Sequence, residues 1–110
     1  MTSYKETNKM LSATEAEQIA LQFLVEDLNV PDEEQEWFTV LISRLVDEKW
    51  YVVEIGVEGL PDKWVLQVYD TKECDPNYTF VSPIKPADGN SDVLDMPERV
   101  AEILIAERGA

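Results

Sequence analysis

The chain has 110 residues, of which 23 are acidic and 9 basic, so its formal net charge is −14 at neutral pH. The length fits one domain, and a hydrophobic content of 45% is too high for disorder driven by charge. The acidic balance argues against binding to nucleic acid or to an anionic membrane, because phosphate contacts need clustered Lys and Arg. With one cysteine and no histidine, the chain can form no internal disulfide, no Cys-rich zinc site and no nucleophile–histidine pair.

The N-terminal segment is polar as far as Met10 and lacks the apolar core of a signal peptide, so we expect a flexible tail over residues 1–11. No stretch reaches the roughly 18 apolar residues that cross a bilayer, and a cytoplasmic location is the resulting expectation. Residues 12–110 are expected to form a single domain. It should open with a helix over 12–28, because Ser12 and Glu15 form a capping box ahead of apolar residues at helical spacing.

An acidic segment follows this helix. Residues 26–36 hold six acids and no base. The helix should stop before Pro31, in the middle of this segment, because proline disfavours helical geometry at the residue before it. The segment reads as an exposed loop that is suited to a basic protein partner. The candidate acidic binding loop comprises Glu26, Asp27, Asp32, Glu33, Glu34 and Glu36.

Three β-rich segments come next, over residues 37–47, 49–58 and 63–70, and short turns connect them. They predict an antiparallel meander, with a fourth strand over 78–84 that Pro83 confines to an edge or ends. A second helix is predicted from an Asp95 cap to Gly109, with Met96, Val100, Ile103 and Leu104 as its apolar stripe. The predicted fold is α+β: a curved antiparallel sheet of three to four strands with both helices on one face, in the order α-β-β-β-(β)-α.

The strands also suggest an interaction surface. Trp50 and Trp64 lie on neighbouring predicted strands and could face the same way, with Val52 and Leu66, on the sheet face away from the helices. These four residues, Trp50, Val52, Trp64 and Leu66, are the candidate interface. The alternatives are that this face is the core, so that Tyr51, Val53 and Ile55 point outward, or that both faces are partly covered.

Few residues offer catalytic or metal chemistry. Cys74 is flanked by Glu73 and Asp75, which raise a thiol pKa and disfavour the thiolate. Glu54 interrupts an apolar strand, but Glu58 on the same face is roughly 13 Å away, too far for a coupled carboxylate pair. The sequence Asp88–Asn90–Asp92 begins like a calcium loop and then lacks the required glycine and glutamate. With no glycine-rich phosphate loop either, we expect no metal, no cofactor and no enzymatic activity.

The segments LSATEAEQIALQFL, KWYVVEIGV and KWVLQVYDTKE together resemble the small PepSY and cystatin-like domains, and several bacterial immunity proteins look similar in outline. In those families a helix lies across an antiparallel sheet, and the last core strand ends in an aspartate and a turn, as residues 69–73 do here. Lys72 stands where the family's turn glycine falls. The resemblance covers roughly residues 12–73 and implies a two-layer binding or inhibitory module in a bacterial protein, without catalytic residues.

Three functions are consistent with this sequence. The first is a noncatalytic protein-interaction module, acting on an unidentified protein or as a homodimer through the aromatic sheet face or an open strand edge. The second is an acidic inhibitor, either of the immunity type or a nucleic-acid mimic that occupies a basic site. The third is a carboxylate-dependent enzyme or ligand-binding domain, which would require Glu54 or Asp70 in a concave pocket.

Overall fold

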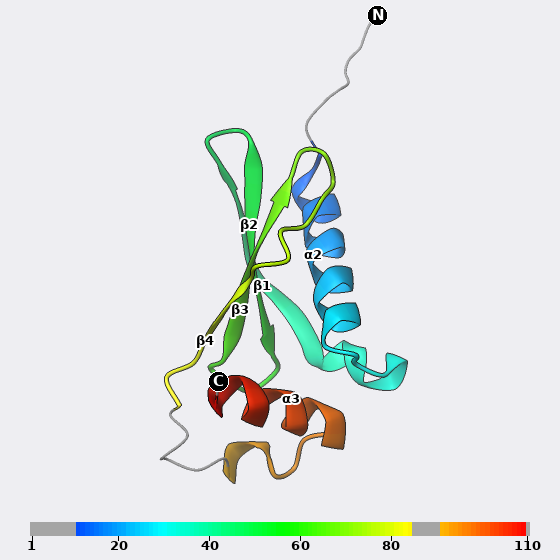
Figure 1. Cartoon of the computed structure of the whole chain (residues 1–110), viewed down its shortest axis with the longest axis vertical. Coiled ribbons are helices and arrows are strands. Elements are labelled where there is room, and N and C mark those ends of the chain that lie inside the picture. Colours follow the sequence, from blue (N-terminus) through cyan, green and yellow to red (C-terminus); the bar gives the residue numbers. More distant parts are fainter. Residues whose placement is uncertain (1–10, 85–90, 110) are drawn as a thin grey trace, which may run out of the picture.

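The computed structural model describes residues 11–84 and 91–109 (Figure 1). In chain order the elements are α2 (Ala13–Asp27), the 3₁₀ helix η1 (Asp32–Trp37), β1 (Phe38–Val46), β2 (Trp50–Val57), β3 (Lys63–Tyr69), β4 (Thr79–Val81), the 3₁₀ helix η3 (Ser91–Val93) and α3 (Glu98–Gly109). The strands form one antiparallel sheet in the order β1-β2-β3-β4. The predicted α+β meander is confirmed, with a short fourth strand that ends before Pro83.

Helix α2 begins where its local sequence predicts. The Ser12 hydroxyl accepts a hydrogen bond from the Glu15 amide at 3.1 Å, and the Glu15 carboxylate accepts one from the Ser12 amide at 3.0 Å. Ala16 and Ala20 are fully buried, and their small side chains let α2 lie close across the sheet (Figure 1). Leu11 is only 4% exposed and joins the same core, so its assignment to a flexible tail over 1–11 is wrong; residues 1–10 lie outside the described part.

The core fills the space between α2 and one face of the sheet. The β2–β3 register sets Ile55 opposite Trp64 and Val53 opposite Leu66, and all four side chains are fully buried. Trp64 packs between two phenylalanine rings, with ring centroids 5.6 Å from Phe38 and 5.1 Å from Phe80. Tilted aromatic contacts of this kind stabilise a core beyond the area they bury.

Two turns that follow strands of the sheet place non-glycine residues in the left-handed region. Asp47 and Glu48 have φ values of 51° and 56°, and the Lys49 amide donates to the Val46 carbonyl at 3.0 Å. Two positive φ values are the signature of the type I′ hairpin turn, whose twist matches that of the strands. Lys72, which stands where the resembling families have glycine, has φ 72° and closes the turn after β3.

Helix α3 lies across the end of the sheet, next to the β2–β3 turn (Figure 1). It begins at Glu98, so the predicted Asp95 cap is wrong: Asp95 belongs to the turns that follow η3, and the first helical hydrogen bond runs from Ala101 to the Pro97 carbonyl. An early α3 amide, that of Val100, is instead satisfied by the Glu34 carboxylate of η1 at 3.2 Å. The negative charge of a carboxylate at this position is also stabilised by the positive N-terminal end of the helix dipole.

A buried ion pair fastens α3 to the sheet. The Arg108 guanidinium donates two hydrogen bonds to the Asp62 carboxylate in the β2–β3 turn, at 2.8 and 2.7 Å, and both side chains are fully buried. Asp92 accepts two more from Arg108, each at 2.9 Å, and these bonds hold the pKa of its carboxyl below the ordinary value. The end of α3, the β2–β3 turn and η3 are thereby tied together.

Candidate interaction surface

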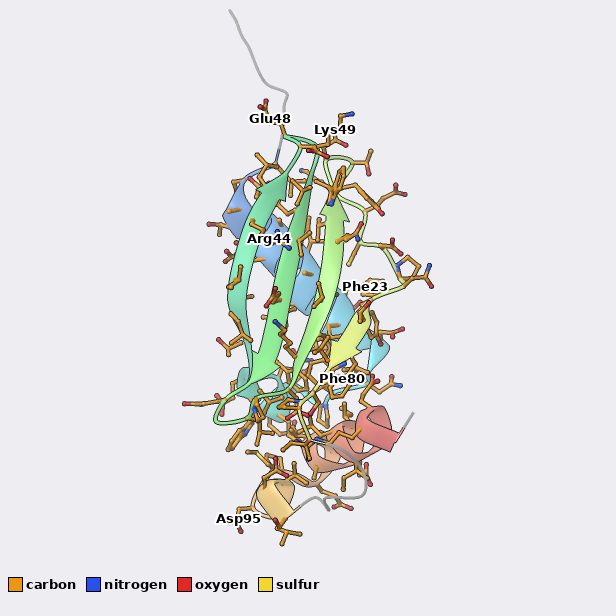
Figure 2. All side chains as sticks on the ribbon, turned by 90° about the vertical axis from the view of Figure 1, so that its left-hand side faces the viewer. Phe23, Arg44, Glu48, Lys49, Phe80 and Asp95 are labelled. Carbon is orange, nitrogen blue, oxygen red and sulfur yellow. The ribbon has the colours of Figure 1, made fainter. Side chains whose placement is uncertain are left out.

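The sheet face opposite α2 is uncovered within the described part of the chain, as Figure 2 shows from that side. Alternation along the strands and the strand register give the residues of this open face. All four strands contribute apolar side chains to it: Leu41, Ile42, Val46, Trp50, Val52, Val65 and Val81. Apolar side chains gathered on one uncovered sheet face often mark a site of interaction.

The structure divides the four predicted interface residues between the two sheet faces. Trp50 and Val52 lie on the open face, opposite Tyr69 and Gln67, but Val52 is only 8% exposed. Trp64 and Leu66 lie on the other face and are fully buried under the helices, so the prediction that all four share one exposed surface is wrong. The alternation within β2 and within β3 was predicted correctly. The register between β2 and β3 was not, and a shift of one residue moves a whole strand's side chains to the opposite face.

The charged groups on the open face are few. Glu54 accepts a hydrogen bond from the Lys63 ammonium at 2.9 Å, and the two side chains are 15% and 36% exposed. Arg44 is exposed on the same face (Figure 2). Gly56 lies beneath Leu41, whose Cδ1 would be 2.9 Å from a Cβ at that position. The open face thus carries two bases and one acid in a chain of net charge −14.

Strand β1 is one edge of the sheet and concentrates exposed hydrophobic surface. Leu41, Ile42 and Leu45 are 51%, 50% and 44% exposed. Ile42 pairs with Glu54 and faces the open side, whereas Leu45 pairs with Tyr51 and faces the α2 side. The edge therefore exposes apolar side chains on both sheet faces, in addition to its outward main-chain groups.

Several acids of the predicted binding loop are engaged within the fold. Glu34 caps α3, as described above, and Asp27 accepts a hydrogen bond from the Tyr78 hydroxyl at 2.6 Å. Burial, and then this bond to Asp27, raise the pKa of Tyr78. Glu26 accepts a hydrogen bond from Gln22, and Asp32 accepts one from Gln35 at 3.3 Å. Asp32, Glu33 and Glu36 nevertheless remain exposed on η1.

The side chains considered for catalysis, Cys74, Glu54 and Asp70, do not form a common site. Burial, followed by the charge of Asp75, raises the pKa of the half-buried Cys74 thiol to about 11, so the thiol is protonated at neutral pH. Cys74 borders an open groove of about 830 Å³ along α2, whose other polar lining residues include Glu15 and Lys72. Glu54 is engaged with Lys63, and Asp70 is exposed after β3. The Cys74 thiol donates a hydrogen bond to the Asp75 carbonyl at 3.8 Å rather than to a basic group in this groove.

Within residues 11–84 and 91–109, no group of three or more Cys, Asp or Glu side chains is placed to hold a metal ion. Asp88 and Asn90 of the calcium-like sequence lie outside the described residues, and Asp92 is bonded to Arg108.

None of the described helices is long and apolar enough to cross a membrane. Comparisons with family models, curated proteins and solved structures gave no match. The candidate surface therefore rests on its own geometry.

Proposed function

We propose that this protein is a noncatalytic protein-interaction module whose contact surface is the open face of the sheet together with the β1 edge. The observation that supports the proposal is the exposure of apolar side chains from every strand on a face that no described element covers. Burying such side chains against a partner stabilises a complex by roughly 25 cal/mol for each Å² removed from water. The Glu54–Lys63 pair inside the face adds a fixed polar feature for specificity.

The residue chemistry supports a binding role over a catalytic one. The single thiol is held protonated, and the chain has no histidine. The carboxylate that the sequence singles out, Glu54, already has a cationic partner at 2.9 Å. Binding a partner does not require any of these groups to react.

An acidic inhibitor is the second candidate, and the exposure of Asp32, Glu33 and Glu36 on one short helix favours it. Such an inhibitor binds its target through charge, so its affinity falls steeply with ionic strength. Binding through the open face depends mainly on apolar burial and should survive added salt.

The test is affinity capture from the native lysate at about 50 mM and about 500 mM salt, with Debye lengths of roughly 14 and 4 Å. Three baits are compared: the wild type, a Val65→Lys variant at the centre of the open face, and an Asp32→Asn, Glu33→Gln, Glu36→Gln variant of η1. A stoichiometric protein retained at high salt, lost by Val65→Lys and kept by the η1 variant supports the proposal. A protein lost at high salt and lost by the η1 variant overturns it in favour of the acidic inhibitor.

A further inference from the structure

We infer that one partner of this surface is a second copy of the chain, joined by antiparallel pairing of the two β1 edges into a continuous eight-stranded sheet. The inference rests on the proposed function, because it names the occupant of the same surface. It follows from three properties of β1: its free edge, its exposed side chains on both faces, and its charge.

The two edges of the sheet differ in what they offer. Strand β4 has three residues and ends before Pro83, so it presents little main chain. Strand β1 has nine residues and no proline. Its register shifts between Val40 and Ile42, which leaves Ile42–Val46 as a regular stretch of roughly 17 Å. A long apolar edge of this kind is a template for another strand.

The side chains distinguish a strand laid alongside β1 from a body docked on the open face. Ile42 is half exposed on the open side, and Leu45 is 44% exposed on the α2 side. A partner on the open face would cover Ile42 and leave Leu45 in water. A strand added at the edge has side chains on both faces and covers both residues at once.

The charge of β1 favours a second copy as the donor of that strand. Two bodies of net charge −14 repel each other, and the repulsion at a contact is smallest where neither surface carries acids. Strand β1 contains no acid and one base, Arg44. A twofold axis perpendicular to the sheet pairs the strand with itself, so each copy supplies the same apolar residues on each face. Registers centred on Arg44 are disfavoured, because they set like charges opposite each other.

This geometry has a functional consequence. A twofold axis perpendicular to the sheet keeps both α2 helices on one side and both open faces on the other. The dimer therefore presents a doubled, continuous open face. A second kind of partner could bind there without competing for the β1 edge.

Sedimentation equilibrium of the full chain tests the inference, since a monomer weighs 12.6 kDa and a dimer twice that. The edge variant is Leu45→Lys, and the matched control is Val81→Lys. The two sites are 44% and 45% exposed, but Val81 lies on β4, at the far edge and on the open face. We expect a wild-type dimer that tightens as salt screens the mutual repulsion. Leu45→Lys should weaken dimerisation by at least about tenfold, and Val81→Lys by less than about twofold.

Two results overturn the inference. One is a wild type that stays monomeric at about 200 µM and about 500 mM salt, conditions under which the repulsion is screened. The other is a dimer that Val81→Lys disrupts and Leu45→Lys does not, because the copies then meet through their open faces. Neither result disproves the proposed function, which the capture experiment with Val65→Lys tests separately. If Leu45→Lys lowers the circular dichroism of the folded state, Ile42→Lys, at a site 50% exposed, replaces it as the edge variant.

Discussion

Replacing Arg108 with methionine should destabilise the fold more than any surface substitution, because it leaves a buried carboxylate without its counter-ion. Arg108 and Asp62 are fully buried side chains joined by hydrogen bonds of 2.7 and 2.8 Å. Methionine fills much of the volume of the arginine stem but donates no hydrogen bond. The Asp62 charge then lies in the interior without these two donors.

The expected loss is about 3–5 kcal/mol, the usual cost of breaking a buried pair by removing one partner. A domain of this size has a total unfolding free energy of about 5–15 kcal/mol, so the loss is a large share of it. Urea unfolding slopes of about 2 kcal/mol per molar turn the loss into a midpoint shift of about 2 M. The guanidinium of the wild type stays charged throughout the working pH range, so titration of Arg108 itself adds no pH dependence to the comparison near neutrality.

The assay is equilibrium urea unfolding, followed by tryptophan fluorescence and by far-ultraviolet circular dichroism. Arg44→Met is the matched control, because Arg44 is exposed on β1 and should change the free energy of unfolding by less than about 0.5 kcal/mol. Adding Asp62→Asn to Arg108→Met should recover part of the loss, since a neutral amide costs less to bury than an unpaired carboxylate. An Arg108→Met loss below about 1 kcal/mol would refute this account of the pair.

Three further predictions concern local features. Glu48→Gly should stabilise the protein by up to about 1 kcal/mol, because glycine adopts φ 56° without the left-handed penalty; no change in the urea midpoint would contradict this. Ser12→Ala should cost about 1 kcal/mol by removing the hydroxyl that accepts from the Glu15 amide, whereas an Ala13→Ser control should not. Cys74 in the folded protein should react slowly with iodoacetamide at pH 8 and about tenfold faster for each pH unit up to pH 10, since its pKa is raised to about 11. A folded-state rate at pH 8 equal to that in urea would contradict the raised pKa.

The features that were predicted correctly are local ones. The Ser12–Glu15 capping box, the alternation of Tyr51, Val53 and Ile55, and the turn at 47–49 each depend on residues a few positions apart. The fold class follows from these segments and the short connections between them.

The features that were missed depend on residues far apart in the chain. Nothing local fixes the β2–β3 register, which places Trp64 in the core while Trp50 stays on the open face. The cap on α3 comes from Glu34, 66 positions away from the amide it meets, and the counter-ion of Asp62 comes 46 positions later. The acidic segment looked like a binding loop because charge alone does not distinguish a solvated acid from one that caps a helix.

The pairing of two copies through the β1 edge is tested most directly by amide hydrogen exchange at low and high protein concentration. The account predicts slower exchange at high concentration in peptides that cover β1, with no change in peptides that cover η1, because pairing protects the outward amides of the edge. Slower exchange confined to η1, or exchange in β1 that does not depend on concentration, would contradict the second copy as the occupant of this edge.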